Sequence, residues 1–533
     1  MHPYVAEDFS DAEVAVLRRY FTNLEGPVFA LVNLPEVVKG ALFARYSRSS
    51  KSLRRLFLDE FVGDLELAGD AGIDATVGLA RADDLYQRIF FEYGDDSVAQ
   101  LGGVHLACEQ ASNLLTKVLE RGRLMSYLEQ STRYLGYDKR LSNGLYRFYR
   151  DGDILDSRYG ARYIGEMDRM FDTYRELLPE LTEWLAGRYP KTAADTDFVY
   201  RQAIRAKALD GLRGLLPASA LSNLGIYASG QAYEALLLRM RAHALPEVHE
   251  YAQLMLDELV KVIPSFLRRL DVPERGLAWT TYLAETRSAT RALLADDEES
   301  TEAESGVRLT SFDPEGETRV LEAIVFANTN LSHDQSARRV AAMTTDEQQT
   351  LMRTYVGQRA NRRHRPGRAF ERTDYRFEIV SDYGAFRDLQ RHRLLTVEWQ
   401  PVSVNLGYDV PEVVREAGLD ARYEESLARS AALYHDVSQE FPEQAQYCVA
   451  LAFRVRYTIQ MNAREAMHLI ELRSGPQGHP SYRLVAQEMA RLIREEAGHQ
   501  GIAAAMHYVD FSDTDLERLE AERNAERNRQ NRS

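Results

Sequence analysis

Residues 233–253, YEALLLRMRAHALPEVHEYAQ, align without a gap with residues 467–487, MHLIELRSGPQGHPSYRLVAQ, at an offset of 234. Arg239 of the first segment aligns with Arg473 of the second. Long-period self-similarity is the mark of an internal repeat, and it has to be weighed before a fold is assigned. Two amphipathic helices can also resemble each other by chance, so this pair alone does not establish a repeat.

A second pair of segments strengthens the repeat. Residues 105–123, HLACEQASNLLTKVLERGR, match residues 375–393, YRFEIVSDYGAFRDLQRHR, more weakly and at an offset of 270. Both pairs occur in the same order in the two halves, which argues against chance likeness. The change of offset indicates an insertion in the first half, within 140–200. We therefore predict two tandem copies of one folding unit.

The composition is that of a folded soluble protein. The 533 residues exceed the size at which a single core stops growing, so two or three domains are expected. Hydrophobic residues make up 45% of the chain and charged residues 28%, as in ordinary globular proteins. The net charge of −15 repels the phosphate backbone of nucleic acids at long range. We therefore expect no nucleic-acid partner.

Two features of the sequence favour a cytoplasmic location. The only cysteines, Cys108 and Cys448, are too few for a disulfide framework or a thiolate metal site, and they fit a reducing compartment. The first residues lack the basic and apolar regions of a signal peptide. The apolar stretch 209–228 is interrupted by Asp, Arg and Pro, so it is unfit to span a membrane. We expect no membrane partner.

An acidic stretch divides the chain near its middle. ADDEESTEAESGVRLTSFDPEGETRV lacks apolar periodicity, as expected of a solvated linker. The resulting parts are a first copy, this linker, a second copy and a charged tail, over 1–294, 295–320, 321–515 and 516–533. Most other segments have helical periodicity, and strands are expected near 104–108 and 376–380. The predicted fold class is helix-rich α+β, with a small sheet in each copy.

An Arg-rich segment in the first half carries groups suited to a bound phosphate and a planar ring. Guanidinium groups bind phosphate through paired hydrogen bonds, hydroxyl groups complete the cradle, and a carboxylate accepts from a sugar hydroxyl or a ring N–H. A solvated helix face is the alternative, which the apolar residues at 124, 125, 127 and 128 weaken. The candidate residues are Arg121, Arg123, Glu129, Ser131 and Arg133.

These residues resemble the signature of the flavin-dependent thymidylate synthases, R-H-R-x7-S with an arginine two residues later. The first half matches it at Arg121, Arg123, Ser131 and Arg133. The second half keeps the complete R-H-R run at 391–393.

The second half carries a further resemblance to the same family. Arg456, Asn462 and Arg464 match an R-x5-N-A-R run that precedes a substrate-facing arginine in the family's C-terminal helix, and Arg473 stands at the position of that arginine. In the first half, the stretch beginning at Arg213 resembles the family's R-x-x-L-P motif.

Each half departs from the family pattern at different positions. Gly122 replaces the histidine of the first R-H-R run, and Pro401 replaces the serine of the second. Ala228 and Gly230 replace the asparagine and the arginine of the N-A-R run in the first half. A site that takes its loop from one copy and its helix from the other would explain these complementary losses.

The resemblance implies reductive methylation of dUMP to dTMP, with FAD as cofactor and NADPH and methylenetetrahydrofolate as co-substrates. It assigns Arg473 the catalytic task of polarising the uracil. It assigns nucleotide binding to Arg121, Arg123, Glu129, Ser131, Arg133 and Arg213. It assigns flavin binding to Arg391, His392, Arg393, Asn462 and Arg464. Because the family forms homotetramers, a duplicated chain is expected to be a homodimer with pseudo-tetrameric symmetry. No metal is expected, because no His/Cys/Asp cluster has ligand spacing in the sequence.

Three alternatives stay open. The family's His-x-Ser motif survives poorly, as 95–97 (Asp-Asp-Ser) and ambiguously around His364, so a diverged flavin- or nucleotide-binding relative without thymidylate synthase activity is the main alternative. A protein that keeps only the fold is the second. The basic run 359–368 also permits a nucleic-acid arm, against the acidic net charge. His392 by itself is more often structural than catalytic, and its flanking arginines lower its pKa.

Overall fold

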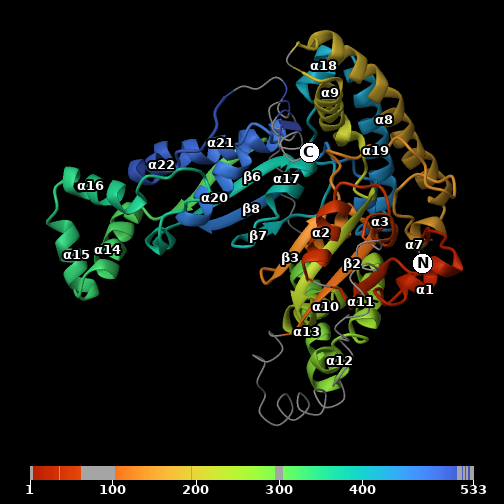
Figure 1. The fold of residues 1–533 in the computed structure, drawn as a ribbon, viewed down its shortest axis with the longest axis horizontal. Coiled ribbons are helices and arrows are strands. Elements are labelled where there is room, and N and C mark those ends of the chain that lie inside the picture. The colour runs from red at the N-terminus through yellow and green to blue at the C-terminus, as the bar shows by residue number, and fades with distance from the viewer. Residues whose placement is uncertain are drawn as a thin grey trace. The chain divides into compact units, whose positions relative to one another are not determined.

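The computed structural model describes residues 4–34, 36–61, 102–193, 195–294 and 304–512, with five further residues of the tail, at 516, 519, 523, 526 and 527. The chain forms two compact units (Figure 1). Unit 1 comprises 1–178, 215–300 and 421–450, and unit 2 comprises 179–214, 301–420 and 451–533. Each unit therefore takes one segment from the opposite half of the sequence.

Backbone hydrogen bonds hold each exchanged segment in its unit. In unit 1, the N–H of Ala218 donates to the carbonyl oxygen of Val449 at 2.7 Å. In unit 2, the N–H of Ala452 donates to the carbonyl oxygen of Gly214 at 2.9 Å. The compact units thus cross the boundary that the sequence suggested between the two copies.

Unit 1 is built around an antiparallel sheet with the strand order β1-β2-β4-β3. Its strands are β1 (Val28–Leu31), β2 (Gly103–Ser112), β3 (Met125–Glu129) and β4 (Leu221–Ser229). The described helices that lie in it are α1 (Asp11–Leu17), α2 (Glu36–Tyr46), α3 (Leu53–Glu60), α6 (Asn113–Leu119), α7 (Gly152–Leu155), α10 (Gly230–Arg241), α11 (Pro246–Leu259), α12 (Pro264–Leu267), α13 (Ala278–Leu293) and, from residue 421 on, α19 (Asp420–Ser438). Helix α8 (Gly160–Arg188) begins in unit 1 and ends in unit 2.

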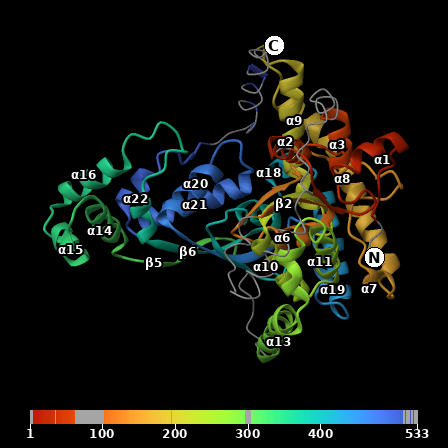
Figure 2. The same cartoon turned by 60° about the horizontal axis from the view of Figure 1, so that its bottom comes forward.

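Unit 2 has a sheet of the same form, with the antiparallel order β5-β6-β8-β7. Its strands are β5 (Gly306–Phe312), β6 (Asp374–Asp382), β7 (Thr396–Trp399) and β8 (Arg454–Asn462). Its helices among the described residues are α9 (Asp197–Leu212), α14 (Gly316–Asn328), α15 (His333–Ala341), α16 (Thr345–Val356), α17 (Tyr383–Leu389), α18 (Glu412–Glu416), α20 (Ala463–Arg473), α21 (Pro480–Glu495) and α22 (Gln500–Ala505). Within this unit, α14, α15 and α16 form a group at one end (Figure 2).

The two sheets confirm the predicted helix-rich α+β fold and agree with the internal repeat. The second and third strands of each order, β2-β4 and β6-β8, pair along most of their length, and a shorter strand flanks each side. The strands expected at 104–108 and 376–380 lie within β2 and β6. Helix α10 follows β4, and α20 follows β8. Each of these helices is followed by a second helix with proline at its first turn, where proline fits best.

The predicted linker is wrong over its second part. Residues 306–312 form β5, which pairs with β6, and α14 begins at Gly316. Leu309 is the buried residue of this otherwise mostly exposed edge strand, so one buried apolar side chain and the ladder hydrogen bonds hold it. Such a strand has too little apolar alternation to be recognised among acidic residues. Residues 295–303 lie outside the described part of the chain, as does most of the predicted tail.

The run that begins at Arg456 resembles part of the family's C-terminal helix, but here residues 454–462 form strand β8. The helical expectation for these residues is therefore wrong. Buried and partly exposed residues alternate along β8, with Tyr457 and Ile459 buried, which is the period of a strand. Among the described residues, no helix has the length and apolar character needed to cross a membrane.

Candidate functional site

Helix α20 begins where strand β8 ends, and Asn462 forms the junction. It is the N-cap of α20, and its Oδ1 accepts a hydrogen bond from the backbone N–H of Glu465 at 2.9 Å. An asparagine at this position satisfies one of the donors that the first helical turn leaves unpaired. The cap therefore fixes the first turn of α20, from which Glu465 and His468 emerge on neighbouring positions of one face.

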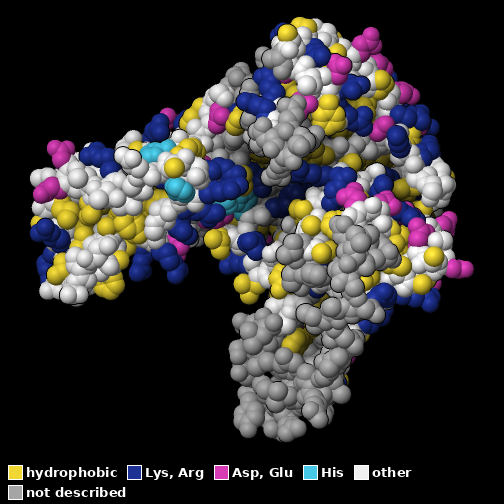
Figure 3. All heavy atoms as spheres, viewed as in Figure 1, with side chains coloured by type: hydrophobic (Ala, Val, Ile, Leu, Met, Phe, Trp, Pro, Cys, Tyr) yellow, Lys and Arg dark blue, Asp and Glu magenta, His cyan; other side chains and the backbone are white. Residues whose placement is uncertain are grey.

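The segment 391–393, between α17 and β7, brings a buried histidine to that face. Nδ1 of His392 lies 3.3 Å from Oε1 of Glu465, and Nε of Arg473 donates to Nε2 of His392 at 3.0 Å. The ring centroids of His392 and His468 are 5.4 Å apart. Basic and histidine side chains gather on the surface over α20 and β8 (Figure 3).

The hydrogen bond from Arg473 shows which tautomer of His392 the structure contains. An arginine N–H is always a donor, so Nε2 of His392 must offer its lone pair to Arg473. The proton of the neutral imidazole is then on Nδ1, which donates to Glu465. Hydrogen bonds therefore run in one direction, from Arg473 through His392 to Glu465, and we call these three residues the Arg473–His392–Glu465 chain.

Burial and neighbouring arginines set the charge of this cluster. Burial, followed by Arg473, holds the pKa of His392 well below its usual range, and burial lowers the pKa of His468 to about 4 with help from Arg365. Burial raises the pKa of Glu465 to about 7, although nearby arginines oppose the rise. Both imidazoles are therefore neutral at pH 7, and the positive charge of the cluster comes from its arginines.

Three possible metal ligands meet here, which the sequence spacing did not reveal. One ligand atom from each of His392, Glu465 and His468 lies within 4.8 Å of the others. His392 is unsuited to bind a cation in this arrangement, because Arg473 occupies the lone pair of Nε2 and Nδ1 carries the proton. The nearby guanidinium groups add repulsion. The donor set fits an anionic or electron-rich ligand better than a metal ion.

A second network joins Arg213 to the same segment. Nη1 of Arg213 lies 3.2 Å from Oδ2 of Asp388, a buried residue of α17 that also pairs with Arg391. Nη2 of Arg213 lies 3.9 Å from Asp382. The sequence assigned Arg213 to substrate binding by resemblance, and the structure brings it beside Arg391 in unit 2. The two carboxylates neutralise much of its charge.

The other residues assigned to flavin binding lie at the edge of the cluster. Arg393 is exposed. Nε of Arg464 donates to the carbonyl oxygen of Pro366 at 2.9 Å, and its Nη1 lies 3.5 Å from Glu371. Arg464 therefore ties the 366–371 segment to the start of α20.

Part of the basic run 359–368 is structural. Arg359 is buried, and its Nη1 donates to Oε1 of Glu471 at 2.6 Å and to the carbonyl oxygen of Ala505 at 2.7 Å. A guanidinium held in this way is not available to a phosphate backbone. The nucleic-acid reading of this run therefore loses its first arginine.

The Arg-rich segment of the first half lies in unit 1. Arg121 and Arg123 are exposed just before β3. Oγ of Ser131 accepts from the backbone N–H of Arg133 at 3.2 Å, and Arg133 is buried. These four residues are close together in sequence and belong to one unit, whereas Arg213 belongs to unit 2.

Glu129 has a buried partner that the sequence did not suggest. Its Oε2 lies 3.1 Å from Nζ of Lys117, and both side chains are almost fully buried. A buried carboxylate needs such a partner to offset its lost hydration. The ion pair gives Glu129 a structural role within unit 1.

The counterpart of the Arg473–His392–Glu465 chain in unit 1 is incomplete. Arg239 lies in the last turn of α10 and aligns with Arg473. Gly122 aligns with His392, and Gln231 aligns with Glu465. Unit 1 therefore lacks both the imidazole and the carboxylate.

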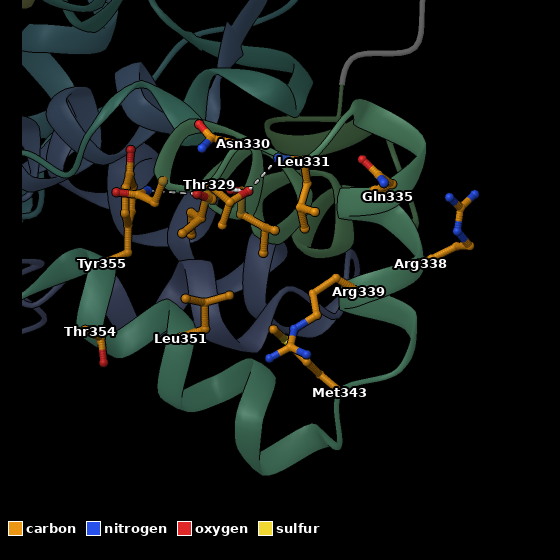
Figure 4. Close-up of a pocket in the computed structure, with 13 residues that line it drawn as sticks. Thr329, Asn330, Leu331, Gln335, Arg338, Arg339, Met343, Leu351, Thr354 and Tyr355 are labelled. Carbon is orange, nitrogen blue, oxygen red and sulfur yellow. Dashed lines mark hydrogen bonds between the residues drawn. The ribbon is translucent and has the colours of Figure 1, made fainter.

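A separate cavity of about 1060 Å³ lies among α14, α15 and α16 (Figure 4). Leu331, Met343 and Leu351 contribute apolar surface, and Arg339 of α15 extends toward Met343, whereas the side chain of Arg338 points outward. None of the residues assigned to the site by resemblance lines this cavity.

Sequence reasoning missed Glu465, His468 and Asp388. The first two have a usable signal, because a Glu-x-x-His spacing directly after an N-capping asparagine places both side chains on one helix face. Asp388 had none, since its role depends on Arg213, which is distant in sequence. The motif 95–97 lies outside the described residues.

Comparison with known proteins assigns the chain to a family. The family model described as thymidylate synthase complementing protein matches residues 42–265 and 308–498. UPF0159 proteins of Chlamydia muridarum and Chlamydia pneumoniae are each 38% identical over 523 residues, covering 97% of this chain and 98% of the relative. A UPF0159 protein of Thermoplasma acidophilum is 32% identical over 513 residues, covering 91% of this chain and 97% of the relative. With one matched segment in each half of the sequence, this chain belongs to the thymidylate synthase complementing protein family.

Proposed function

We propose that this chain synthesises thymidylate, by reductive methylation of dUMP to dTMP with methylenetetrahydrofolate as carbon donor and NADPH as reductant. Family membership supports this class of reaction. The observation that carries the proposal is the bonding of Arg473. Its Nε donates to the neutral imidazole of His392, so this bond leaves the guanidinium charge in place, and the nearby carboxylate of Asp388 favours the charged form.

Arg473 has the features required to stabilise a developing negative charge. The side chain is partly buried, burial lowers its pKa, and its guanidinium lies 5.6 Å from the ring centroid of Tyr482. A cationic donor held in such a place stabilises charge that forms on a uracil carbonyl more strongly than a donor in water does. In this proposal Arg473 polarises the pyrimidine.

The charge of the cluster also fits FAD. Bound FAD would supply the hydride-transfer chemistry that amino-acid side chains lack. Arg393, which is exposed, and Arg391, which is partly exposed beside its ion pair with Asp388, are suited to the anionic groups of such a cofactor. Asn462 and Arg464 hold the start of α20 and the 366–371 segment. We propose that these residues, with His392, form the flavin site.

Nucleotide binding is assigned to a second set of residues. Arg121, Arg123, Ser131 and Arg133 of unit 1 carry the phosphate-binding donors of the proposal. Glu129 and Arg213 are held in ion pairs, so we propose that both act by positioning neighbouring groups.

The absorption spectrum of the purified protein tests the cofactor. We expect the visible bands of oxidised flavin after addition of FAD and removal of the excess, and we expect NADPH to bleach them. Arg391→Ala combined with Arg393→Ala should release the flavin, because two cationic donors are lost. A protein that stays colourless after FAD addition would rule out the flavin site, whereas flavin retained without dTMP formation would favour the diverged relative.

A further inference from the structure

The buried carboxylate of Glu465 reaches Arg473 only through His392. Glu465 is on the first turn of α20 and Arg473 is its last residue, eight positions further along, which places them about 12 Å apart along the helix axis. His392, from the segment after α17, bridges the gap with one ring nitrogen on each side. All of these groups belong to unit 2.

We propose that Glu465 is a positioning residue that holds the Arg473 guanidinium in its working orientation by fixing the tautomer of His392. The inference rests on the proposed function only for the identity of the ligand that Arg473 contacts. A carboxylate that accepts from Nδ1–H keeps the lone pair of His392 on Nε2. This lone pair is what Nε of Arg473 requires.

Loss of the acceptor at position 465 has a definite consequence. The imidazole can then carry its proton on Nε2. In that tautomer the Nε2–H of His392 faces the Nε–H of Arg473, and both groups are donors. Two donors cannot share a hydrogen bond, so Arg473 must move or His392 must rotate. Carboxylates that accept from the second ring nitrogen of metal-binding histidines fix the tautomer in the same manner, and their removal costs about ten- to a hundredfold in metal affinity or activity.

Protonation of Glu465 weakens the same bond. Hydrogen bonds to an ionised acceptor are about twice as strong as those to a neutral one. Five groups face Glu465. They are His392 and Arg393 from the segment after α17, His468 and Arg464 from α20, and Arg365 from the loop before β6. The arginines favour the ionised carboxylate and burial disfavours it, and burial prevails. The bond from His392 should therefore weaken as the pH falls through about 7.

The stability of the fold should change in the opposite sense. Burial raises the pKa of Glu465 in the folded protein above its unfolded value, so the folded state binds the proton more tightly. The stabilising contribution is complete below the unfolded pKa and is lost as the pH rises through about 7. Ionisation thus stabilises the orientation of Arg473 and destabilises the fold, a conflict expected of a functional site.

Spectra of the protein labelled with nitrogen-15 in histidine, with no substrate present, test this inference. His392→Gln identifies the signal of His392. At pH 8 we expect the Nδ1–H tautomer in the parent protein and in Glu465→Gln, whose amide oxygen still accepts. We expect loss of that tautomer in Glu465→Ala. Gln231→Ala, at the aligned position in unit 1, is the control and should leave the signal unchanged.

Kinetics provide the second measurement. Glu465→Ala should lower kcat by about ten- to a hundredfold with a smaller change in KM, and Glu465→Gln should flatten the fall of kcat between pH 8 and pH 6. Glu465→Gln should also melt higher than the parent at pH 8 but not at pH 4, which shows that the variant folds. An unchanged His392 tautomer in Glu465→Ala overturns the inference. The expected tautomers without any dTMP formation leave it standing and refute the proposed function instead.

Discussion

Arg473→Ala should reduce kcat for dTMP formation by about a hundred- to a thousandfold, the usual cost of removing one donor that stabilises developing charge. The effect should fall mainly on kcat, because the proposed contact is strongest in the transition state. Steady-state kinetics with purified variants measure it, and complementation of cells that cannot make thymidylate gives a second readout at matched soluble expression.

Arg239→Ala is the matched control for this prediction. Arg239 has the equivalent place in α10, but Gly122 and Gln231 stand where His392 and Glu465 would be needed. We therefore expect turnover close to that of the parent protein. Equal losses of turnover in the two variants would mean two equivalent sites. They would contradict the expectation that only the arginine of the second copy, Arg473, acts in turnover.

Glu247→Ala should destabilise unit 1 by about 3–5 kcal/mol, the range for leaving buried polar partners unpaired. The carboxylate of Glu247, in α11, is fully buried and accepts from the backbone N–H of Ser112 at 2.8 Å, from its hydroxyl at 2.6 Å, and from the hydroxyl of Tyr447 at 2.8 Å. Tyr447 belongs to the segment that unit 1 takes from the second half of the sequence. Removing this acceptor should loosen the exchanged segment.

Hydrogen exchange of the amides in α11 and in residues 444–450, followed against denaturant concentration, measures this effect. Gln253→Ala, on the exposed side of α11, should change the stability by less than about 0.5 kcal/mol. Because burial raises the pKa of Glu247 to about 7, its ionisation opposes folding, and the protection of these amides should decline as the pH rises through that value. Equal protection in Glu247→Ala and Gln253→Ala would show that Tyr447 is held by other contacts.

Sequence patterns predicted the parts of the fold that depend on local periodicity. The strands near 104–108 and 376–380 are confirmed, and the two sheets of the same form agree with the tandem repeat. Strand β8 was missed because the family's helix was extended backwards over a segment whose burial alternates with period two. Strand β5 was missed because its single buried residue, Leu309, gives no pattern.

The exchange of segments between the units could not be predicted from periodicity. An amphipathic helix shows which of its faces is buried, but the pattern does not say which copy of a repeat it packs against. The position of Arg213 beside Asp388 follows from this exchange. Likewise, the motifs identified His392 and Arg473 but not the hydrogen bond between them. The contact of Glu465 with His392 depends on the packing of α20 against the segment after α17, which the sequence did not reveal.

The most direct test of the account is the conversion of dUMP by the purified protein. The protein is incubated with dUMP, methylenetetrahydrofolate, NADPH and FAD, and the nucleotides are separated and identified by mass. We predict dTMP that forms in proportion to enzyme concentration, depends on each of the four added compounds, and is nearly abolished by Arg473→Ala but not by Arg239→Ala. Folded, flavin-loaded protein that binds dUMP and forms no dTMP would contradict the proposed function.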